Sequence, residues 1–180
     1  MLSVLRPSGL TLLSSALVIG MFCCPPRAQG RSSNLTKTEQ EEDIRLSAFL
    51  FLLDVGTGPD PDYSFSCLSV DFEGFKTLHD PSDSLLIRFP KMHRTIRKAS
   101  ECEFVAKPKD YFSAVRDKQT GKAAWLISVG PIRWINDSEV RVVGMRYCGE
   151  LCMWTTTLVA KWVDGQWKVS VDPKAFVFVS

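Results

Sequence analysis

Residues 140–180 constrain the fold of this 180-residue chain more than any other stretch. They are rich in valine, threonine and tryptophan, which favour strands, and two short turn sequences interrupt them. The first turn is Gly149-Glu150-Leu151. The second is Asp164-Gly165, a dipeptide typical of two-residue hairpin turns. The stretch therefore predicts three antiparallel strands joined by two hairpins.

The Asp164-Gly165 turn also predicts the register of the second hairpin. It pairs Val163 with Gln166, and the pairing continues back to Leu158 opposite Val171. Because side chains alternate between the two faces of a strand, one face is apolar and the other is polar. Over the three strands, the predicted core face carries Val140, Val142, Gly144, Arg146, Trp154, Thr156, Leu158, Ala160, Trp162, Trp167, Val169 and Val171.

Arg146 is the one charged side chain on this predicted core face. The turn at residues 149–151 pairs Cys148 with Cys152. Two residues further along each strand it pairs Arg146 with Trp154. A guanidinium in a core must be paired, stacked on an aromatic ring, or turned toward a cavity. The simpler interpretation is a stabilising stack of Arg146 on Trp154, and the alternative is a small polar binding site.

The first thirty residues predict a secretory signal peptide. Arg6 precedes a short apolar run at residues 10–22, and Ala28-Gln29-Gly30 supplies small residues where a signal peptidase cuts. The run is shorter than the roughly 20 residues that span a bilayer, so we expect cleavage after Gly30 and no membrane span afterwards. The protein would then be secreted or periplasmic. A lipoprotein ranks second. Its lipidated residue would be Cys23 or Cys24, and Gly20-Met21-Phe22 before them do not supply the two small residues expected there.

Four cysteines lie beyond the signal peptide, and an even number in an exported chain predicts disulfides. Three pairings are open. Cys148 and Cys152 face each other across a hairpin neck, so we favour that pair. By elimination, Cys67 then pairs with Cys102. The alternative is a metal or redox site, which ranks second because the three-residue spacer differs from the Cys-x-x-Cys of redox proteins.

The charge balance argues against a nucleic-acid partner. Two of the 22 basic residues lie in the predicted signal peptide, which holds no acid, so 20 basic residues remain against 20 acidic ones. The one locally basic stretch, residues 91–98, is more typical of a solvated helix face. A neutral chain without a basic surface lacks the electrostatic attraction that nucleic acids require.

An N-terminal helix is predicted at residues 38–54, after a flexible polar leader at residues 31–37. Thr38 and Glu41 have the spacing of a capping box, in which a hydroxyl and a carboxylate bind the first free amides. Apolar residues then recur at helical spacing, and the last two turns are apolar nearly all round. Such a helix needs a broad apolar partner, and a sheet is the natural one.

The middle of the chain mixes helix and strand signals. Residues 63–72 are a candidate strand, and Asp80-Pro81 then supplies an N-cap and a first-turn proline for a helix interrupted at Pro90. A second helical piece is expected at residues 92–98. From residue 100 onward the apolar period becomes two. Further strands are predicted at residues 102–106, 111–115, 123–129 and 132–135.

This order predicts a single α+β domain over residues 38–180, with N-terminal helices packed on a curved antiparallel sheet of about 5–6 strands. It resembles the cone-shaped fold of the nuclear transport factor two-like superfamily, in which a curved sheet wraps the helices. It also resembles cystatin-like domains, which pack one helix on a bent sheet.

A second resemblance rests on the last third of the chain. The sequence Tyr147-Cys148-Gly149-Glu150-Leu151-Cys152, followed by Gly165-Gln166-Trp167, resembles a group of uncharacterised exported bacterial proteins. Those proteins carry Tyr-Cys-Gly-x-Leu-Cys, a Gly-x-Trp turn and a Trp-Ile-Ser ending. This chain departs from them at Phe178-Val179-Ser180 and at Met153-Trp154. The resemblance implies export and no known activity.

The cone-shaped folds imply two kinds of site. Some members hold a ligand inside the cone, and enzymes among them use an Asp/His pair for acid–base catalysis on small hydrophobic substrates. His79 and His93 are the only histidines in this sequence, and neither falls on the predicted core face, so we expect both on the surface. The sequence contains neither a nucleophile elbow nor a phosphate-binding glycine loop. It therefore predicts no catalytic residue, no metal site and no cofactor.

The candidate ligand-binding residues are Arg146, Trp154, Thr156 and Tyr147, at one end of the predicted sheet. We expect an exported, non-catalytic domain of the cell envelope that binds a small molecule or another envelope protein. Two alternatives stay open. One is a small cone-fold enzyme acting on a small hydrophobic substrate, and the other is a structural or inhibitory module.

Overall fold

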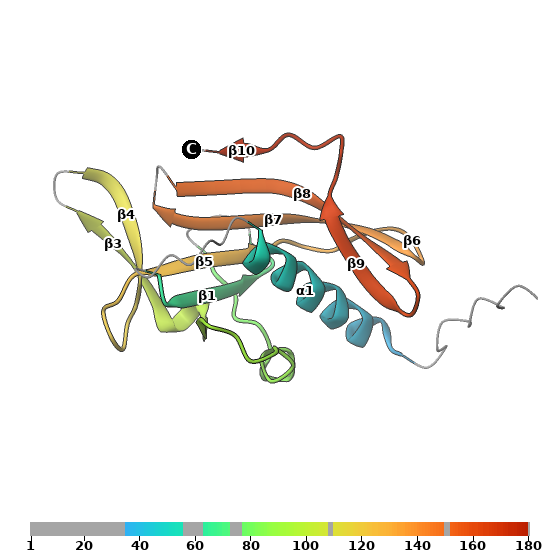
Figure 1. Cartoon of the computed structure of the whole chain (residues 1–180), viewed down its shortest axis with the longest axis horizontal. Helices are drawn as coiled ribbons and strands as arrows, with labels where there is room; N and C mark the ends of the chain where they lie inside the picture. The colour runs from blue at the N-terminus through green and yellow to red at the C-terminus, as the bar shows by residue number, and fades with distance from the viewer. Residues whose placement is uncertain (1–34, 56–62, 73–76, 108–109, 150–151, 180) are drawn as a thin grey trace, which may run out of the picture.

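The computed structural model describes residues 35–55, 63–72, 77–107, 110–149 and 152–179 (Figure 1). The predicted signal peptide and nearly all of the predicted leader lie outside these ranges. Within them, a curled mixed sheet carries one long helix on one face and a two-stranded ribbon on the other. The α+β prediction holds only in part, because the described chain is mostly β and has one long helix.

Helix α1, Lys37–Asp54, begins earlier than the sequence analysis predicts. Its N-cap is Thr36, whose hydroxyl accepts a hydrogen bond from the Glu39 amide. The Glu39 carboxylate accepts one in return from the Thr36 amide, at 2.7 Å. The capping box predicted two residues further on is wrong, because Glu41 instead accepts a hydrogen bond from the Trp134 indole.

Eight strands of the described chain form the main sheet. They are β1 (Phe65–Val70), β2 (Thr95–Lys98), β5 (Ala124–Val129), β6 (Arg133–Asn136), β7 (Glu139–Gly149), β8 (Cys152–Val163), β9 (Gln166–Val171) and β10 (Phe178–Val179). Six follow the path β10-β8-β7-β5-β1-β2, while β6 pairs with β7 and β9 with β8. Strand β1 is parallel to both β2 and β5, so the sheet is mixed and not antiparallel throughout as predicted.

The segment between β1 and β2 differs from its prediction. Helix α2 is a single turn, Asp83–Leu86, capped by Ser82 and not by Asp80. The Asp80 carboxylate instead accepts hydrogen bonds from Ser100, at 2.8 Å from its amide and 2.6 Å from its hydroxyl. Residues 92–98, predicted to be helical, contribute β2. The edge of β1 offers them backbone partners, whereas so short a helix is unstable alone.

Strands β3 (Cys102–Lys107) and β4 (Asp110–Asp117) form the separate two-stranded ribbon, after a 3-10 turn, η1 (Ala99–Glu101). Both strands lie where the sequence predicts them. A disulfide between Cys67 and Cys102 ties the base of the ribbon to β1, as the favoured pairing requires. The apolar cluster between ribbon and sheet consists of Phe65, Cys67, Cys102, Val115, Ala124, Leu126, Met145 and Tyr147.

The C-terminal hairpin of β8 and β9 confirms the predicted register. The strands pair from Val163 opposite Gln166 back to Leu158 opposite Val171. The turn holds Asp164-Gly165 in left-handed backbone, with φ of 52° and 80°. Because glycine and aspartate adopt this conformation more readily than other residues, the dipeptide determines where the chain reverses.

A second disulfide, between Cys148 and Cys152, closes the hairpin of β7 and β8. Arg146 stands opposite Trp154 in this hairpin, as predicted. Nearer the turn a β-bulge shifts the pairing, so that Gly149 and not Cys148 stands opposite Cys152. The two disulfides are compatible with an oxidising, extracytoplasmic location.

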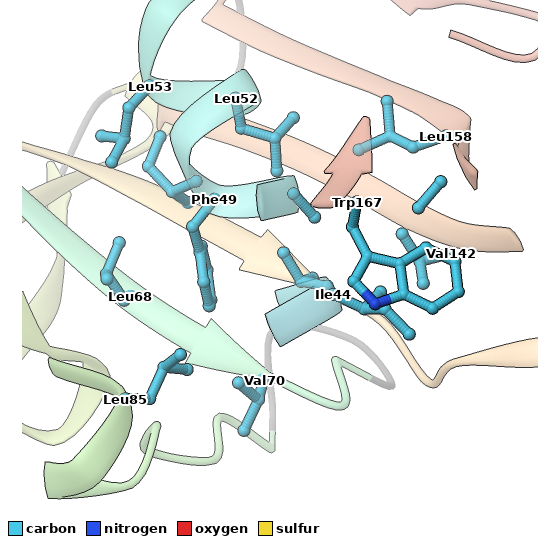
Figure 2. Close-up of a cluster of buried hydrophobic side chains, with 14 of the residues drawn as sticks. Ile44, Phe49, Leu52, Leu53, Leu68, Val70, Leu85, Val142, Leu158 and Trp167 are labelled. Carbon is cyan, nitrogen blue, oxygen red and sulfur yellow. The ribbon is translucent and has the colours of Figure 1, made fainter. Parts of the chain in front are cut away.

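The larger core lies between α1 and one face of the main sheet, which we call the helix face (Figure 2). Ile44, Phe49 and Leu52 of α1 are fully buried against it. The helix comes so close to β7 that a Cβ added to Gly144 would lie 3.0 Å from Leu52 and 2.8 Å from Leu158. Glycine at this position therefore sets how closely the helix can pack.

Candidate functional site

Arg146 lies on the helix face of β7 and contacts the C-terminal end of α1. It is 6% exposed, so the surrounding elements cover almost the whole side chain. Its Nη1 donates a hydrogen bond to the carbonyl of Val55, the C-cap residue of α1. Its guanidinium lies over the Trp125 ring of β5, 4.5 Å from the centroid, and not over Trp154 as predicted.

The contact with Val55 is one reason why an arginine is buried at this position. A helix C-terminus carries free carbonyls and the equivalent of about half a negative charge. The last turn of α1 has no basic residue of its own, so Arg146 supplies the cation from the sheet. A guanidinium has five N–H donors, and this cap uses Nη1.

A second arginine, Arg94, stands two residues before Ile96, which pairs with Ser66 of β1, and Ser66 pairs in turn with Trp125 of β5. Burial lowers the pKa of Arg146 below its usual range, and the positive charge of Arg94 lowers it further. The Nε of Arg146 and the Nη1 of Arg94 are both buried without a hydrogen-bond partner. No carboxylate of the residues that the structure describes pairs with either guanidinium. Each of the two arginines thus keeps one buried nitrogen without a hydrogen-bond partner.

Two neutral groups complete the cluster. Ser66 of β1 stands opposite Trp125 of β5 in the parallel register, so both side chains lie on the helix face. The Ser66 hydroxyl and the Trp125 Nε1 are buried without a partner. The Tyr63 ring packs against Trp125, with 5.3 Å between centroids. We call Arg94, Arg146, Trp125 and Ser66 the arginine site.

The other buried charges of the described chain are compensated. Asp117, at the end of β4, accepts a hydrogen bond from the Arg97 guanidinium at 3.1 Å. Asp172, just after β9, forms an ion pair with Arg141 at 3.2 Å. Arg146 is the exception among the buried charged residues in the described ranges, because no carboxylate of those residues forms an ion pair with it.

The structure separates the four residues that the sequence analysis proposed as a ligand site. Trp154 is half-buried opposite Arg146 and packs against the larger core. Thr156 is buried, and its hydroxyl donates a hydrogen bond to the Phe176 carbonyl at 3.4 Å. Tyr147 lies on the opposite face, beneath the ribbon, because neighbouring residues of a strand alternate. Of the four, Arg146 alone belongs to the arginine site.

Sequence reasoning missed the other three members of this site. Trp125 stands in the predicted strand at residues 123–129, and its indole N–H was the signal that it needs a partner. Arg94 lies in the stretch predicted as a helix face. Pairing between strands that are far apart in the sequence places both residues, and local periodicity does not show such pairings.

The histidines and the possible metal ligands form no second site among the described residues. His79 and His93 are both exposed, and His93 directly precedes Arg94 in the sequence. In the described ranges, no group of three or more His, Cys, Asp or Glu side chains is placed to hold a metal ion. No helix among those residues is long and apolar enough to cross a bilayer.

Two surface pockets are distinct from the arginine site. One, of about 350 Å³, lies beside Trp134 where β6 meets the start of α1. The other, of about 390 Å³, lies beside Val143 on the opposite face of β7. Its Arg141 is already paired with Asp172, and water reaches its exposed arginine, Arg133. Neither pocket carries a buried charge that lacks a partner.

No family model, no curated protein and no solved structure matches this chain. The resemblances to cone-shaped and cystatin-like folds, and to exported bacterial proteins, therefore stay predictions.

Proposed function

We propose that this chain is a non-catalytic binding domain of an exported protein, and that it binds a small molecule at the arginine site. The observation that supports the proposal is the buried side chain of Arg146, whose Nε has no hydrogen-bond partner and which pairs with no carboxylate of the described residues. The two disulfides agree with export, since such bonds persist in oxidising compartments.

The fold offsets only part of the free-energy cost of burying the charge of Arg146. A buried charge is costly unless nearby partners replace the water it loses. The Val55 carbonyl and the Trp125 ring offset part of this cost for Arg146. They do not satisfy its Nε, and they do nothing for Arg94. A bound molecule that accepts a hydrogen bond from the unsatisfied Nε of Arg146 would remove part of the remaining cost.

The enzyme alternative requires a group that transfers a proton beside the bound molecule. Arginine keeps its proton at ordinary pH, and a serine hydroxyl such as that of Ser66 acts as a nucleophile only beside a base. The two histidines, which would be the natural bases, are both exposed to solvent, including His93 beside Arg94. The chemistry of the arginine site therefore favours binding over catalysis.

A thermal-shift screen of the oxidised, exported protein against lipids, sugars and metabolites tests the proposal. A molecule that binds the folded state raises Tm once its concentration exceeds Kd. We expect at least one compound to raise the Tm of wild type and of Arg133→Gln, but not of Arg146→Gln. Arg133 is the matched control, because it is an exposed arginine on β6. Shifts of equal size in all three proteins would contradict the proposal.

A second candidate, binding to another envelope protein, rests on the C-terminal strand. Residues 176–179 are four consecutive exposed apolar residues, and Phe176 is 97% exposed. Strand β10 ends the path of the main sheet, so its outer edge is able to accept an added strand. Exposed aromatic residues on a sheet edge are typical of protein interfaces.

Photo-crosslinking in the exporting cell tests this second candidate. A photoreactive phenylalanine analogue at Phe176 is compared with the same analogue at Ile87, which is 84% exposed on a different part of the surface. We expect a discrete adduct from position 176 alone. If both positions give the same adducts, or neither gives any, residues 176–179 are not a specific interface.

A further inference from the structure

We propose that the pocket beside Val143 is a second binding site, and that it binds a phosphate monoester with an apolar body. It lies on the face of the sheet opposite the arginine site, and it does not depend on the function proposed there. Its volume of about 390 Å³ falls in the usual range of small-molecule sites. Among the described residues that line it, the charged ones are Arg133, Arg141, Asp172 and Lys174.

The pocket lies on the part of the sheet that the β3–β4 ribbon leaves uncovered. Alternate side chains of β7 point to the face of the ribbon, and those of Met145 and Tyr147 are buried beneath it. Val143 is the next residue in this row and is 48% exposed. An apolar group bound in the pocket would remove this valine from water. The other uncharged residues nearby are Pro131, Val142, Thr157 and Ala175.

The turn after β9 holds two of the basic residues in place. Asp172 is buried, and its amide donates a hydrogen bond to the Thr157 carbonyl of β8 at 2.9 Å. Its carboxylate forms the ion pair with Arg141 at 3.2 Å and accepts a hydrogen bond from the Lys174 amide at 3.0 Å. Because one buried carboxylate holds both residues, little ordering is left for a ligand to impose.

The charges that line the pocket do not balance. Arg133 stands directly opposite Arg141 in the antiparallel register of β6 and β7, so both guanidinium groups lie on one face. Like charges in this arrangement destabilise a sheet. Neither Arg133 nor Lys174 forms an ion pair with a carboxylate of the described residues. Since Asp172 offsets one of the three cations, two positive charges are left over.

A phosphate monoester matches this excess better than a carboxylate does. Near neutral pH it carries a charge of about −2 and three strong acceptor oxygens. Arginine binds two such oxygens with its planar fork, and lysine binds phosphate as a point charge. Arg133, Arg141 and Lys174 are all exposed, so a dianion bound among them keeps part of its hydration. A monocarboxylate would leave one positive charge uncompensated.

Phenyl phosphate, inorganic phosphate, benzoate and benzyl alcohol are suitable probes, because they vary the head group and the apolar body separately. Binding to the oxidised, exported protein is measured by isothermal titration calorimetry at about pH 8, above the second phosphate pKa of about 6. We expect phenyl phosphate to bind about tenfold more tightly than benzoate or inorganic phosphate, since each lacks one set of contacts. Benzyl alcohol should not bind measurably.

Substitutions of exposed residues place the binding in the pocket. Arg133→Gln and Lys174→Gln should each weaken the binding of phenyl phosphate about tenfold, because each removes a charged hydrogen-bond donor. Arg116→Gln is the matched control and should change nothing, since Arg116 is an exposed arginine on β4 outside the pocket. Val143→Ser should weaken the binding of phenyl phosphate and leave that of inorganic phosphate unchanged.

Vesicles of phosphatidylcholine with and without phosphatidic acid distinguish a lipid from a soluble source of the phosphate monoester. Binding to the phosphatidic acid vesicles that Arg133→Gln abolishes would support a lipid source. Binding of phenyl phosphate without binding of these vesicles would support a soluble one.

Three outcomes would overturn the inference. If Arg116→Gln weakens binding as much as Arg133→Gln, or if neither does, phosphate is attracted to the surface in general and the pocket is not its site. If benzoate binds as tightly as phenyl phosphate, the pocket does not select a dianion. None of these results bears on the proposed function, which depends on Arg146 and is tested with Arg133→Gln as a variant that keeps it.

Discussion

At the scale of single residues, the buried charges of this protein fall into two kinds. Asp117 has its counter-charge in Arg97 and two further donors in Thr120, at 2.8 Å from the amide and 2.6 Å from the hydroxyl. Arg146 has a carbonyl and an aromatic ring instead, and its Nε has no hydrogen-bond partner. The first arrangement is self-sufficient and structural, whereas the second still lacks an acceptor.

The Asp117 network predicts a specific loss of stability in acid. The Thr120 hydroxyl, followed by the Thr120 amide and Arg97, lowers the pKa of Asp117. The stabilisation is therefore fully present above the unfolded pKa of about 3.9 and is lost as pH falls through the lower folded pKa. We expect Asp117→Asn to lower the free energy of unfolding by about 1–3 kcal/mol at pH 7, because buried donors lose their charged acceptor.

Urea unfolding of wild type and Asp117→Asn between pH 7 and pH 2 measures this difference. It should be constant down to about pH 4 and shrink below that value. A difference that persists unchanged at pH 2 would show that the ionised carboxylate is not its source.

At the scale of elements, the packing of α1 on β7 determines how the helix face is filled. Ile44, Phe49 and Leu52 are fully buried there (Figure 2). The close approach at Gly144 determines how near the helix lies to the sheet. The same placement brings the C-cap carbonyl of Val55 to Arg146, so the packing of the helix and the geometry of the arginine site are linked.

Gly144→Ala is expected to destabilise the protein by about 1–3 kcal/mol, because the added methyl overpacks a core that is already full. The new Cβ would meet Leu158 at 2.8 Å and Leu52 at 3.0 Å, and both leucines are fully buried. Gly130→Ala is the matched control, since its nearest contact is an ordinary 3.4 Å. Chemical unfolding of both variants measures the difference, and equal effects would show that the helix is not held at Gly144.

At the scale of the whole molecule, one sheet carries two separate apolar clusters on its two faces. Helix α1 covers the larger one, and the β3–β4 ribbon covers the smaller one at the other face (Figure 1). The disulfide from Cys67 to Cys102 joins the ribbon to the sheet across 35 residues, whereas that from Cys148 to Cys152 spans four. The first constrains the chain as a whole and the second constrains one hairpin.

Removing the two disulfides is expected to have unequal effects on stability. In the chain-entropy model the longer loop is worth about 4 kcal/mol and the shorter about 2 kcal/mol. The double variant Cys67→Ala with Cys102→Ala should therefore lose more than Cys148→Ala with Cys152→Ala. Guanidinium unfolding under oxidising conditions measures both losses. An equal or reversed order would indicate that the ribbon is held mainly by its apolar contacts.

Local sequence patterns were sufficient for the parts of the fold that neighbours in the chain decide. The Asp164-Gly165 turn and strict alternation predicted the register of β8 with β9, and placed Arg146 on the core face. The hairpin neck suggested the Cys148–Cys152 disulfide. These features depend on backbone conformations and side-chain periods that a few consecutive residues determine.

Only the tertiary structure decided the features that distant segments make together. Residues 92–98 have a helix-like pattern, and their last four residues become strand β2 because β1 offers an edge. Arg146 is capped to Val55, 91 residues away, and stacks on Trp125 of a different strand and not on its register partner Trp154. The sequence by itself determined that a cation would be buried. Which groups surround it depends on long-range packing, for which no local pattern exists.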